Sequence, residues 1–251
     1  MIDSPRLHHN SQTVSLTLDS SLIQSVMRRQ DPTELVLDYT RTMMGCLLFE
    51  PRPASVLMIG LGGGSMLKYL EAYVPESDLT AVEISQDVID MRNDFCIPPD
   101  NERLRIVCAD GAAYVRKPPH AYDLILVDGF SGEGIPDALC SPSFYRHCRA
   151  ALTPRGLLVA NVQADTQQTR DIARRIGKAF GGCVISVESD EGGNEIVTAG
   201  DPALFEDTSR DFGARWEALA PVHQQTLAVC STRFERALRQ RPTLASQLGS
   251  D

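Results

Sequence analysis

The pattern of hydrophobic and polar positions divides the chain into a short N-terminal region and a longer region of alternating strands and helices. Residues 13–18 alternate between polar and apolar side chains, as a half-buried strand does, and residues 22–27 form a second short run. Asp19 and the serines after it supply a turn between the two runs, so we predict a small β-hairpin. Residues 32–49 show helical spacing and begin with a proline, which suits the first position of a helix.

From residue 55 onward, apolar runs of strand length alternate with helical patterns, which indicates βαβ units and a parallel sheet. We expect strands at 55–59, 78–82, 104–108, 122–127 and 157–162, with helices at 86–96, 143–152 and 166–180. Two later apolar runs, 183–187 and 195–199, are joined by a connection too short for a crossover helix. They can therefore form only an antiparallel hairpin.

A parallel sheet closed by an antiparallel hairpin is typical of the class I methyltransferase fold. We therefore predict a Rossmann-like α/β fold with a seven-stranded, mostly parallel sheet and an antiparallel C-terminal hairpin. The pattern divides the chain into an N-terminal β-hairpin with a linking helix over 1–50, an α/β domain over 51–200, and a C-terminal helical extension over 201–251. The extension is expected to hold two or three short helices.

Composition and charge exclude several classes of protein. With 251 residues, of which 43% are hydrophobic, the chain can bury one full core. The formal net charge of −9 speaks against a nucleic-acid-binding scaffold, which needs a basic face. No apolar run approaches the ~18 residues of a membrane span, and the first residues lack the pattern of a signal peptide. The seven cysteines form no C-x-x-C pair, so we expect reduced thiols in a cytoplasmic protein and no metal site.

A glycine-rich turn follows the first strand of the α/β domain. The apolar residues 56–59 lead directly into Gly60, and a helical pattern begins after the turn. Such a unit holds nucleotides or adenosyl groups, because a Cβ would block both the left-handed turn and the close approach of a ligand. A dinucleotide fingerprint needs Gly or Ala where this chain has Ser65, whereas Gly60, Gly62 and Gly64 have the spacing of S-adenosylmethionine-type sites.

An acidic residue ends each of the next three predicted strands. Glu83 is placed to accept hydrogen bonds from both hydroxyls of a ribose, since a carboxylate offers only acceptors. Asp110, followed by Gly111 and Ala112, can accept from an adenine amino group, cap the next helix, or do both. Asp128 ends a strand expected to be buried on both faces, so it points into the crevice above the sheet and is our candidate for the reaction. Capping or orienting a loop is the alternative role for this acid.

Together these segments resemble the polyamine aminopropyltransferases, the spermidine synthase family. The resemblance rests on residues 56–64, 81–84, 109–112 and 122–128 and on the loop 128–139. The N-terminal hairpin, with Leu18, Asp19 and Gln24, is similar to the one that precedes the catalytic domain in that family. The resemblance covers roughly residues 13–200 and makes 51–200 the nucleoside-binding catalytic domain.

The resemblance implies a role for each candidate residue. Gln24 would approach the sulfonium of the donor, the three glycines of the turn with Glu83 and Ile84 would bind the ribose side of the nucleoside, and Asp110 with Gly111 and Ala112 would bind the adenine. Asp128 would be the catalytic aspartate, and Tyr39 would help to seat the amine. The donor would be decarboxylated S-adenosylmethionine or S-adenosylmethionine, the acceptor a small amine, and the protein a homodimer.

The chain also departs from the pattern of that family. The aspartate of the family's Gly-Gly-Gly-Asp-Gly-Gly motif falls at Gly63, and of its Tyr-His-Glu only Tyr39 is present, followed by Thr40 and Arg41. Its late proline- and tryptophan-rich acceptor segment has no counterpart. Fewer acids would hold a long polycation less well, and Arg41 would add a positive charge, so we expect a smaller or less cationic acceptor.

We predict a transferase that moves an aminopropyl or other alkyl group from a sulfonium donor to an amine, with Asp128 as base. Only a neutral amine is nucleophilic, and burial must narrow the gap between the amine pKa of ~10.4 and the aspartate pKa of ~3.9. An S-adenosylmethionine-dependent methyltransferase and a non-catalytic adenosyl-nucleoside-binding protein remain as alternatives. Ser65 and the antiparallel hairpin disfavour a nicotinamide oxidoreductase.

Overall fold

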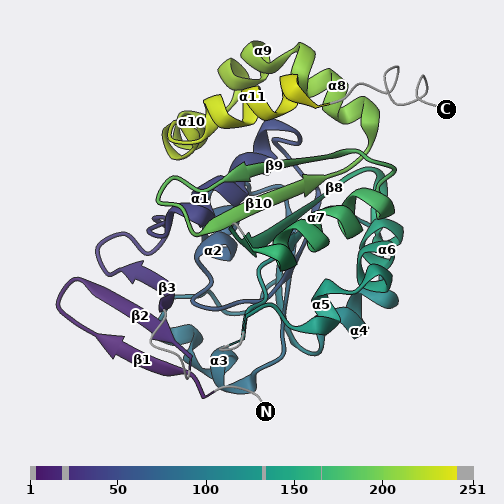
Figure 1. Ribbon diagram of the computed structural model, residues 1–251. Coiled ribbons are helices and arrows are strands. Elements are labelled where there is room, and N and C mark those ends of the chain that lie inside the picture. Colours follow the sequence, from purple (N-terminus) through teal and green to yellow (C-terminus); the bar gives the residue numbers. More distant parts are fainter. Residues whose placement is uncertain (1–3, 19–22, 132–133, 165, 242–251) are drawn as a thin grey trace.

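The computed structural model describes residues 4–18, 23–131, 134–164 and 166–241 of the chain (Figure 1). Within them, a three-stranded sheet in the order β1-β2-β3 precedes a seven-stranded sheet in the order β6-β5-β4-β7-β8-β10-β9. The turn predicted at Asp19 lies outside the described residues.

The N-terminal sheet consists of β1 (Arg6–His9), β2 (Thr13–Thr17) and β3 (Ile23–Arg28), all antiparallel. The predicted hairpin is β2 with β3. Alternation along β2 places Val14 and Leu16 on one buried face of the sheet. Strand β1 was not predicted, because a short and largely exposed strand carries no apolar alternation in its sequence.

The linking segment differs from the single helix predicted over 32–49. Helix α1 (Asp38–Met43) is followed directly by a 3₁₀ helix (Met44–Leu48), and the residues before α1 form turns and loop. The carboxylate of Asp31 accepts hydrogen bonds from the backbone and the hydroxyl of Thr33, at 3.1 and 2.7 Å. This is the contact that an N-cap residue makes, and Glu34 N also donates to the carbonyl oxygen of Asp31, but the turn does not continue and helix α1 starts at Asp38.

The large sheet confirms the predicted α/β fold. Its strands are β4 (Ser55–Ile59), β5 (Asp78–Glu83), β6 (Leu104–Cys108), β7 (Tyr122–Val127), β8 (Leu152–Gln163), β9 (Val184–Glu188) and β10 (Asn194–Ala199). Strands β4 to β8 are parallel, and β10 is antiparallel to both β8 and β9. Strand β8 begins earlier than residue 157, because Leu152 already pairs with Tyr122 before a shift of register.

Helices cover both faces of this sheet (Figure 1). They are α2 (Ser65–Tyr73), α3 (Gln86–Asp90) with a 3₁₀ turn (Met91–Asn93), α4 (Gly111–Arg116), α5 (Asp137–Cys140), α6 (Pro142–Ala151) and α7 (Gln167–Ala179). Alternate residues of β7 enter two separate cores: Leu126 packs in the cluster that holds α2, and Ile125 in the one that holds α4 to α7. Burial on both faces explains why these strands are continuously apolar in sequence.

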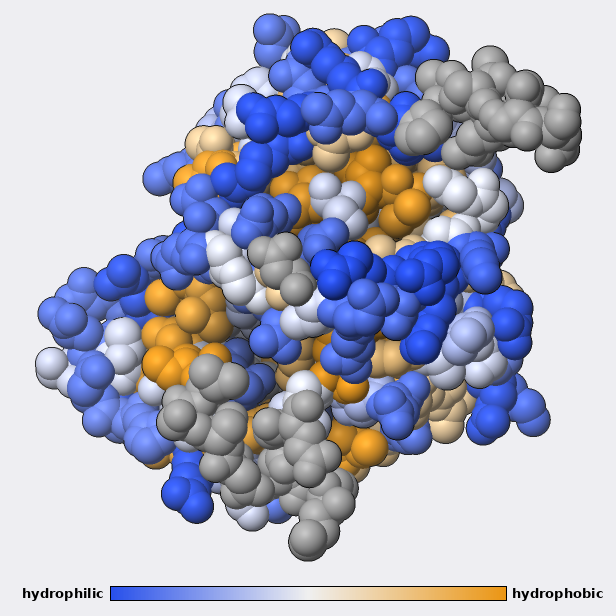
Figure 2. Space-filling model, viewed as in Figure 1, coloured by the Kyte–Doolittle hydropathy of each residue, from blue (hydrophilic) through white to orange (hydrophobic). Residues whose placement is uncertain are grey.

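Between the last strand and residue 241, where the described part of the chain ends, there are four helices, rather than two or three. They are α8 (Pro202–Arg210), α9 (Phe212–Ala218), α10 (Pro221–Leu227) and α11 (Ser231–Gln240). Phe205 and Phe234 contact the ring of Phe49, with centroids 4.9 and 6.3 Å away, so the extension shares the main core. Figure 2 shows a hydrophilic outer surface on these helices, with apolar side chains along their border with the sheet. No helix among the described residues is long and apolar enough to cross a membrane.

Candidate active site

A cavity of about 410 Å³ opens at the carboxyl ends of the central strands. Its lining includes the following residues that the sequence singled out: Gln24, Tyr39, Gly60, Gly62, Glu83, Ile84, Asp110, Gly111 and Asp128. The order of strands reverses between β4 and β7, and open α/β sheets bind their ligands at such a point. Segments far apart in the sequence therefore meet around one space large enough for a nucleoside.

Two predicted residues, Gly64 and Ala112, are not part of this lining. Gly64 precedes the first residue of α2 with a φ of +65°, and a Cβ there would lie 2.6 Å from the side chain of Ile97. The backbone N–H of Ala112 donates to Asp110 at 2.7 Å. In the structure these two residues shape the elements beside the cavity.

The glycine turn lets two strand ends meet. Gly60 has a φ of +93° and Gly62 a φ of +51°, both in the left-handed region that favours glycine. A Cβ on Gly60 would collide with the carbonyl oxygen of Asp128. Glycine at this position is therefore required for the end of β4 to lie against the end of β7.

Glu83 is fixed by the glycine turn. It is buried at the end of β5, and its Oε2 accepts a hydrogen bond from Leu61 N at 2.9 Å. Its Oε1 accepts from Ser85 N at 3.0 Å. Each carboxylate oxygen can accept a further hydrogen bond, so the group is held in place with acceptors left for a ligand.

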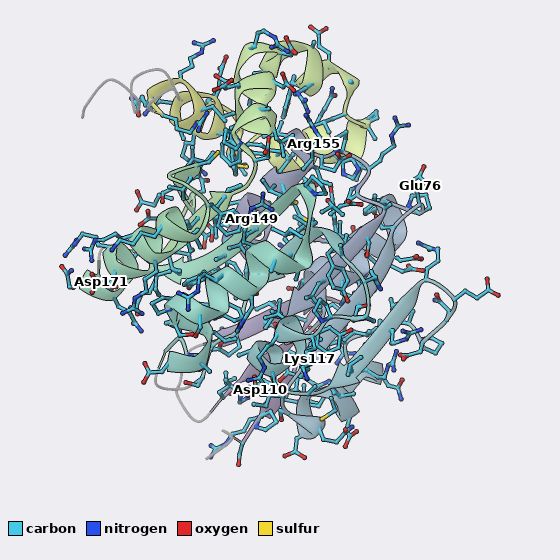
Figure 3. All side chains as sticks on the ribbon, turned by 90° about the vertical axis from the view of Figure 1, so that its right-hand side faces the viewer. Glu76, Asp110, Lys117, Arg149, Arg155 and Asp171 are labelled. Atoms are coloured by element: carbon cyan, nitrogen blue, oxygen red, sulfur yellow. The ribbon has the colours of Figure 1, made fainter. Side chains whose placement is uncertain are left out.

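Asp110 caps helix α4 and lines the cavity as well. Its Oδ1 accepts from the backbone N–H groups of Ala112 and Ala113, at 2.7 and 3.1 Å. The predicted capping role is thus confirmed. The predicted contact of Asp110 with an adenine amino group stays a prediction. Figure 3 shows Asp110 in the lower part of the molecule, with Arg149 near mid-height and Arg155 above it.

Asp128 receives two hydrogen bonds directly after β7. Its Oδ2 accepts from the hydroxyl of Tyr39 at 3.2 Å, and its Oδ1 accepts from Asn161 Nδ2 at 2.9 Å. Removal from bulk water raises the pKa of the Asp128 carboxyl, and the hydrogen bonds from Asn161 and Tyr39 oppose this effect. The same burial, together with the nearby charge of Asp128, holds the pKa of Tyr39 well above its usual value. Tyr39 therefore acts as a neutral donor beside a carboxylate.

Two neighbours of the site were missed from the sequence. Asn161 is 4% exposed and is the one amide within the otherwise apolar residues 157–162, a signal that could have identified it. Ser25 lines the cavity, and its Oγ accepts from Gly63 N at 2.9 Å. That contact joins the N-terminal sheet to the glycine turn, and nothing in the local sequence indicates it.

The structure shows what surrounds Gly63 and Arg41, the two positions that depart from the pattern of the resembled family. A Cβ at Gly63 would lie 2.7 Å from the ring of Phe95 and 3.0 Å from Ser25, so a side chain there would require these neighbours to shift. The guanidinium of Arg41 donates to the carbonyl oxygens of Leu35 and Val36, at 2.7 and 3.1 Å, and does not line the cavity. Arg41 therefore does not place its positive charge at the cavity, in contrast to the expectation from the sequence. Among the described residues, no group of three His, Cys, Asp or Glu could hold a metal ion.

The geometry agrees with the match to a known family. The model of the spermine/spermidine synthase domain matches residues 37–188. The chain belongs to this family. A polyamine aminopropyltransferase of Neisseria meningitidis is 42% identical over 187 residues, which are 74% of this chain and 71% of that protein. One of Chromobacterium violaceum is 39% identical over 208 residues, 82% of this chain and 76% of that protein. The resemblance inferred from the sequence is confirmed.

Solved structures share the fold. A probable spermidine synthase from Corynebacterium glutamicum has a TM-score of 0.68 and 19% identity, covering 95% of this chain and 91% of that one. Human methyltransferase-like protein 13 in complex with SAH has a TM-score of 0.56 and 22% identity, covering 82% of this chain and 91% of that one. The predicted methyltransferase-type fold is confirmed.

Proposed function

We propose that this protein transfers an aminopropyl group from decarboxylated S-adenosylmethionine to a small amine. The observation that carries the proposal is that Asp128, a buried and doubly hydrogen-bonded carboxylate, faces the same cavity as Glu83 and Asp110. Members of the matched family named above are aminopropyltransferases. The cavity thus combines a place for a nucleoside with a base at its side.

The nucleoside would lie along the carboxyl ends of β4, β5 and β6. Glu83 would accept from the ribose hydroxyls and Asp110 from the adenine amino group, with Gly111 beside the ring. Ile84, which is 55% exposed at the cavity, would contribute an apolar contact to the nucleoside. This arrangement would direct the sulfonium toward Gln24 and Asp128.

Asp128 would then act as the base of the transfer. The amine nitrogen attacks the carbon next to the sulfonium, the C–N bond forms as the C–S bond breaks, and methylthioadenosine leaves. The nitrogen must lose one proton in this sequence, and Asp128 would receive it. Burial raises the pKa of Asp128 and thereby brings it nearer to that of the amine. Tyr39 would fix the carboxylate from the side of α1 and border the place of the amine.

Binding and chemistry are tested separately. We expect methylthioadenosine to raise the melting temperature and to give a calorimetric signal, because a ligand that binds only the folded state stabilises it. Glu83→Ala should lose most of this affinity. An assay of the wild-type protein with decarboxylated S-adenosylmethionine and a panel of amines should release methylthioadenosine. No binding signal at saturating nucleoside, or release with none of the amines, would refute the proposal.

A methyltransferase activity is the second candidate, and Gly63 favours it. The position that holds an aspartate in the family's glycine motif is filled by Phe95 and Ser25 in this chain. S-adenosylmethionine would then replace its decarboxylated form as donor. The two products distinguish the activities: formation of S-adenosylhomocysteine from S-adenosylmethionine indicates methyl transfer, whereas formation of methylthioadenosine from decarboxylated S-adenosylmethionine indicates transfer of the aminopropyl group. A protein that binds the nucleosides and forms neither product would be the non-catalytic alternative.

We also infer a homodimer, formed through the N-terminal sheet. Strands β1 and β3 are the edges of that sheet among the described residues, and Ile23 of β3 is 54% exposed. An unpaired edge can extend across a two-fold axis into a partner. Light scattering after size exclusion should give twice the chain mass of 27.5 kDa, and the mass of a single chain would contradict the inference.

The cysteines support a cytoplasmic location. All seven are free thiols, five of them buried, whereas Cys96 and Cys108 are exposed. Exposed free thiols persist in a reducing compartment. Fractionation of the cells should therefore recover the protein with cytoplasmic markers.

A further inference from the structure

We propose that the β9–β10 hairpin positions Asp128 for catalysis, acting through Asn194 and Asn161. The proposal rests on the proposed function in one respect, the role of Asp128 as the base. Asn161, on β8, donates from Nδ2 to Asp128 Oδ1 at 2.9 Å. Asn194, the first residue of β10, donates from its own Nδ2 to Asn161 Oδ1 at 2.9 Å. A chain of two amides therefore runs from the hairpin to the carboxylate.

The orientation of both amides follows from the carboxylate. An ionised carboxylate only accepts hydrogen bonds, so Asn161 must turn its NH₂ toward Asp128. Its oxygen then faces Asn194, which must present an NH₂ in turn. With Asn194 in place, a rotation of the Asn161 amide would bring two donors together on one side and two acceptors on the other. Asn194 therefore holds the Asn161 amide in the orientation in which its NH₂ group donates to Asp128.

The same hairpin also supports the second donor to Asp128. The backbone N–H of Glu191, in the turn between β9 and β10, donates to Asp38 Oδ2 at 2.7 Å. Asp38 is buried in α1 and is followed directly by Tyr39, whose hydroxyl donates to Asp128. Both hydrogen bonds to the carboxylate thus trace back to one hairpin. A shift of this hairpin would disturb both donors together.

The groups around Asp128 determine the expected effect on pH dependence. The other titratable groups that line the cavity among the described residues are Tyr39, Glu83 and Asp110, and α1 adds Asp38 behind Tyr39. Strands β3 and β8 bring uncharged groups: Gln24, Ser25 and Asn161. No described cation lines the cavity. Loss of an amide donor therefore leaves the charged form of Asp128 with less support, and the pKa of Asp128 rises.

The test uses Asn194→Ala and Asn161→Ala, with Thr198→Val as matched control. Thr198 lies on the same strand as Asn194, is fully buried, and its hydroxyl has no hydrogen-bond partner in the described structure. With the best amine of the wild-type panel, we expect Asn161→Ala to move the acid limb of the kcat profile to higher pH by about one pH unit and to lower kcat about tenfold. Asn194→Ala should give a smaller change in the same direction, although it does not touch the carboxylate.

The readouts separate positioning from mere stability. All three variants should bind methylthioadenosine about as the wild type does, and Thr198→Val should keep the wild-type pH profile. A lower melting temperature for Asn194→Ala with an unchanged pH profile would overturn the proposal. The pKa of Asp128, followed by carbon NMR of labelled aspartates and assigned with Asp128→Asn, gives a measure that needs no turnover. If the wild type is inactive with every amine, the proposed function fails, and an unchanged Asp128 pKa in both asparagine variants refutes the positioning role by itself.

Discussion

At the scale of single residues, Asp128 shows how opposing effects are combined in one group. Burial disfavours its charge, whereas Tyr39 and Asn161 donate hydrogen bonds to that charge, and burial is the larger effect on its pKa. The carboxylate is thus a stronger base than a free aspartate, yet each of its oxygens is fixed by a donor. Such a group is suited to receive a proton from a positioned amine.

Replacing this base should separate binding from turnover. Asp128→Asn keeps the shape of the side chain, and its amide can still pair with Asn161 and with the Tyr39 hydroxyl. We expect nucleoside affinity within a few-fold of the wild type and kcat lower by about 10²–10⁴, the usual contribution of general base catalysis. Isothermal calorimetry and the methylthioadenosine assay measure the two quantities. Wild-type turnover in this variant would show that the acid is structural.

The same substitution should stabilise the fold. A carboxyl whose pKa is raised in the folded state stabilises the protein when protonated, and this contribution is lost as the pH rises through the folded pKa. Above that pKa the ionised Asp128 lowers the free energy of unfolding, and Asp128→Asn removes this loss. Each kcal/mol gained would raise Tm by about 2–4 °C in a protein of this size. The gain should shrink as the pH is lowered through the raised pKa of Asp128, and a gain independent of pH in thermal scans would contradict this explanation.

At the scale of elements, the structure follows the sequence wherever the apolar pattern is continuous. Residues 104–108 and 122–127 were predicted as strands with the bounds that β6 and β7 have. The predicted helix over 86–96 is shorter in the structure, where α3 ends at Asp90 and a 3₁₀ turn follows. Local hydrogen bonds of polar side chains and the packing of neighbouring elements set such ends, and neither is visible in the apolar spacing.

The glycine turn gives a prediction at this scale. Gly60→Ala places a Cβ against the carbonyl oxygen of Asp128 in a residue with a φ of +93°. We expect a loss of about 2–4 kcal/mol in the free energy of unfolding, because both the backbone conformation and the meeting of β4 with β7 are strained. Urea denaturation of the variant and the wild type measures this difference in the free energy of unfolding.

Gly213→Ala is the matched control for that substitution. Gly213 lies in α9, and a Cβ there meets no atom within 4 Å. Alanine has the higher helix propensity, so this variant should gain about 0.5–1 kcal/mol. Equal effects of the two substitutions would mean that crowding at Gly60 is not what requires glycine.

At the scale of the whole molecule, the distribution of charge bears on the acceptor. The net charge of −9 belongs to the whole chain, whereas the described lining of the cavity holds three carboxylates: Glu83, Asp110 and Asp128. Glu83 and Asp110 lie at the ends of β5 and β6, where the nucleoside is proposed to bind. Within the described residues, Asp128 is then the carboxylate left to face an amine.

We therefore expect putrescine and spermidine to be poor acceptors. A second ammonium group in the cavity would lack a carboxylate partner among the described residues, and an unpaired charge away from water typically costs a few kcal/mol. Amines with a single charge should be preferred. The assay compares kcat/KM across mono-, di- and triamines with decarboxylated S-adenosylmethionine as donor. A value for putrescine on the order of 10⁴ M⁻¹s⁻¹ or higher would contradict the expectation.

The sequence by itself determined the fold class, the strand ends and the acids that follow them. These features depend on local patterns: continuous apolar runs, a glycine turn after β4, and single carboxylates at Glu83, Asp110 and Asp128. Parallel strands place their carboxyl ends at one edge, so acids at strand ends had to gather there. The family followed from the same segments and is confirmed by the match over residues 37–188.

Only the tertiary structure decided which groups touch those acids. Asn161, Asn194 and Tyr39 come from β8, β10 and α1, and their contacts depend on the register of β10 against β8 and on the position of α1. Likewise, Phe95 fills the space beside Gly63 from a segment distant in the sequence. Hydrogen bonds and steric contacts act over a few ångströms in space, and the apolar periodicity of one strand carries no information on its neighbours' side chains.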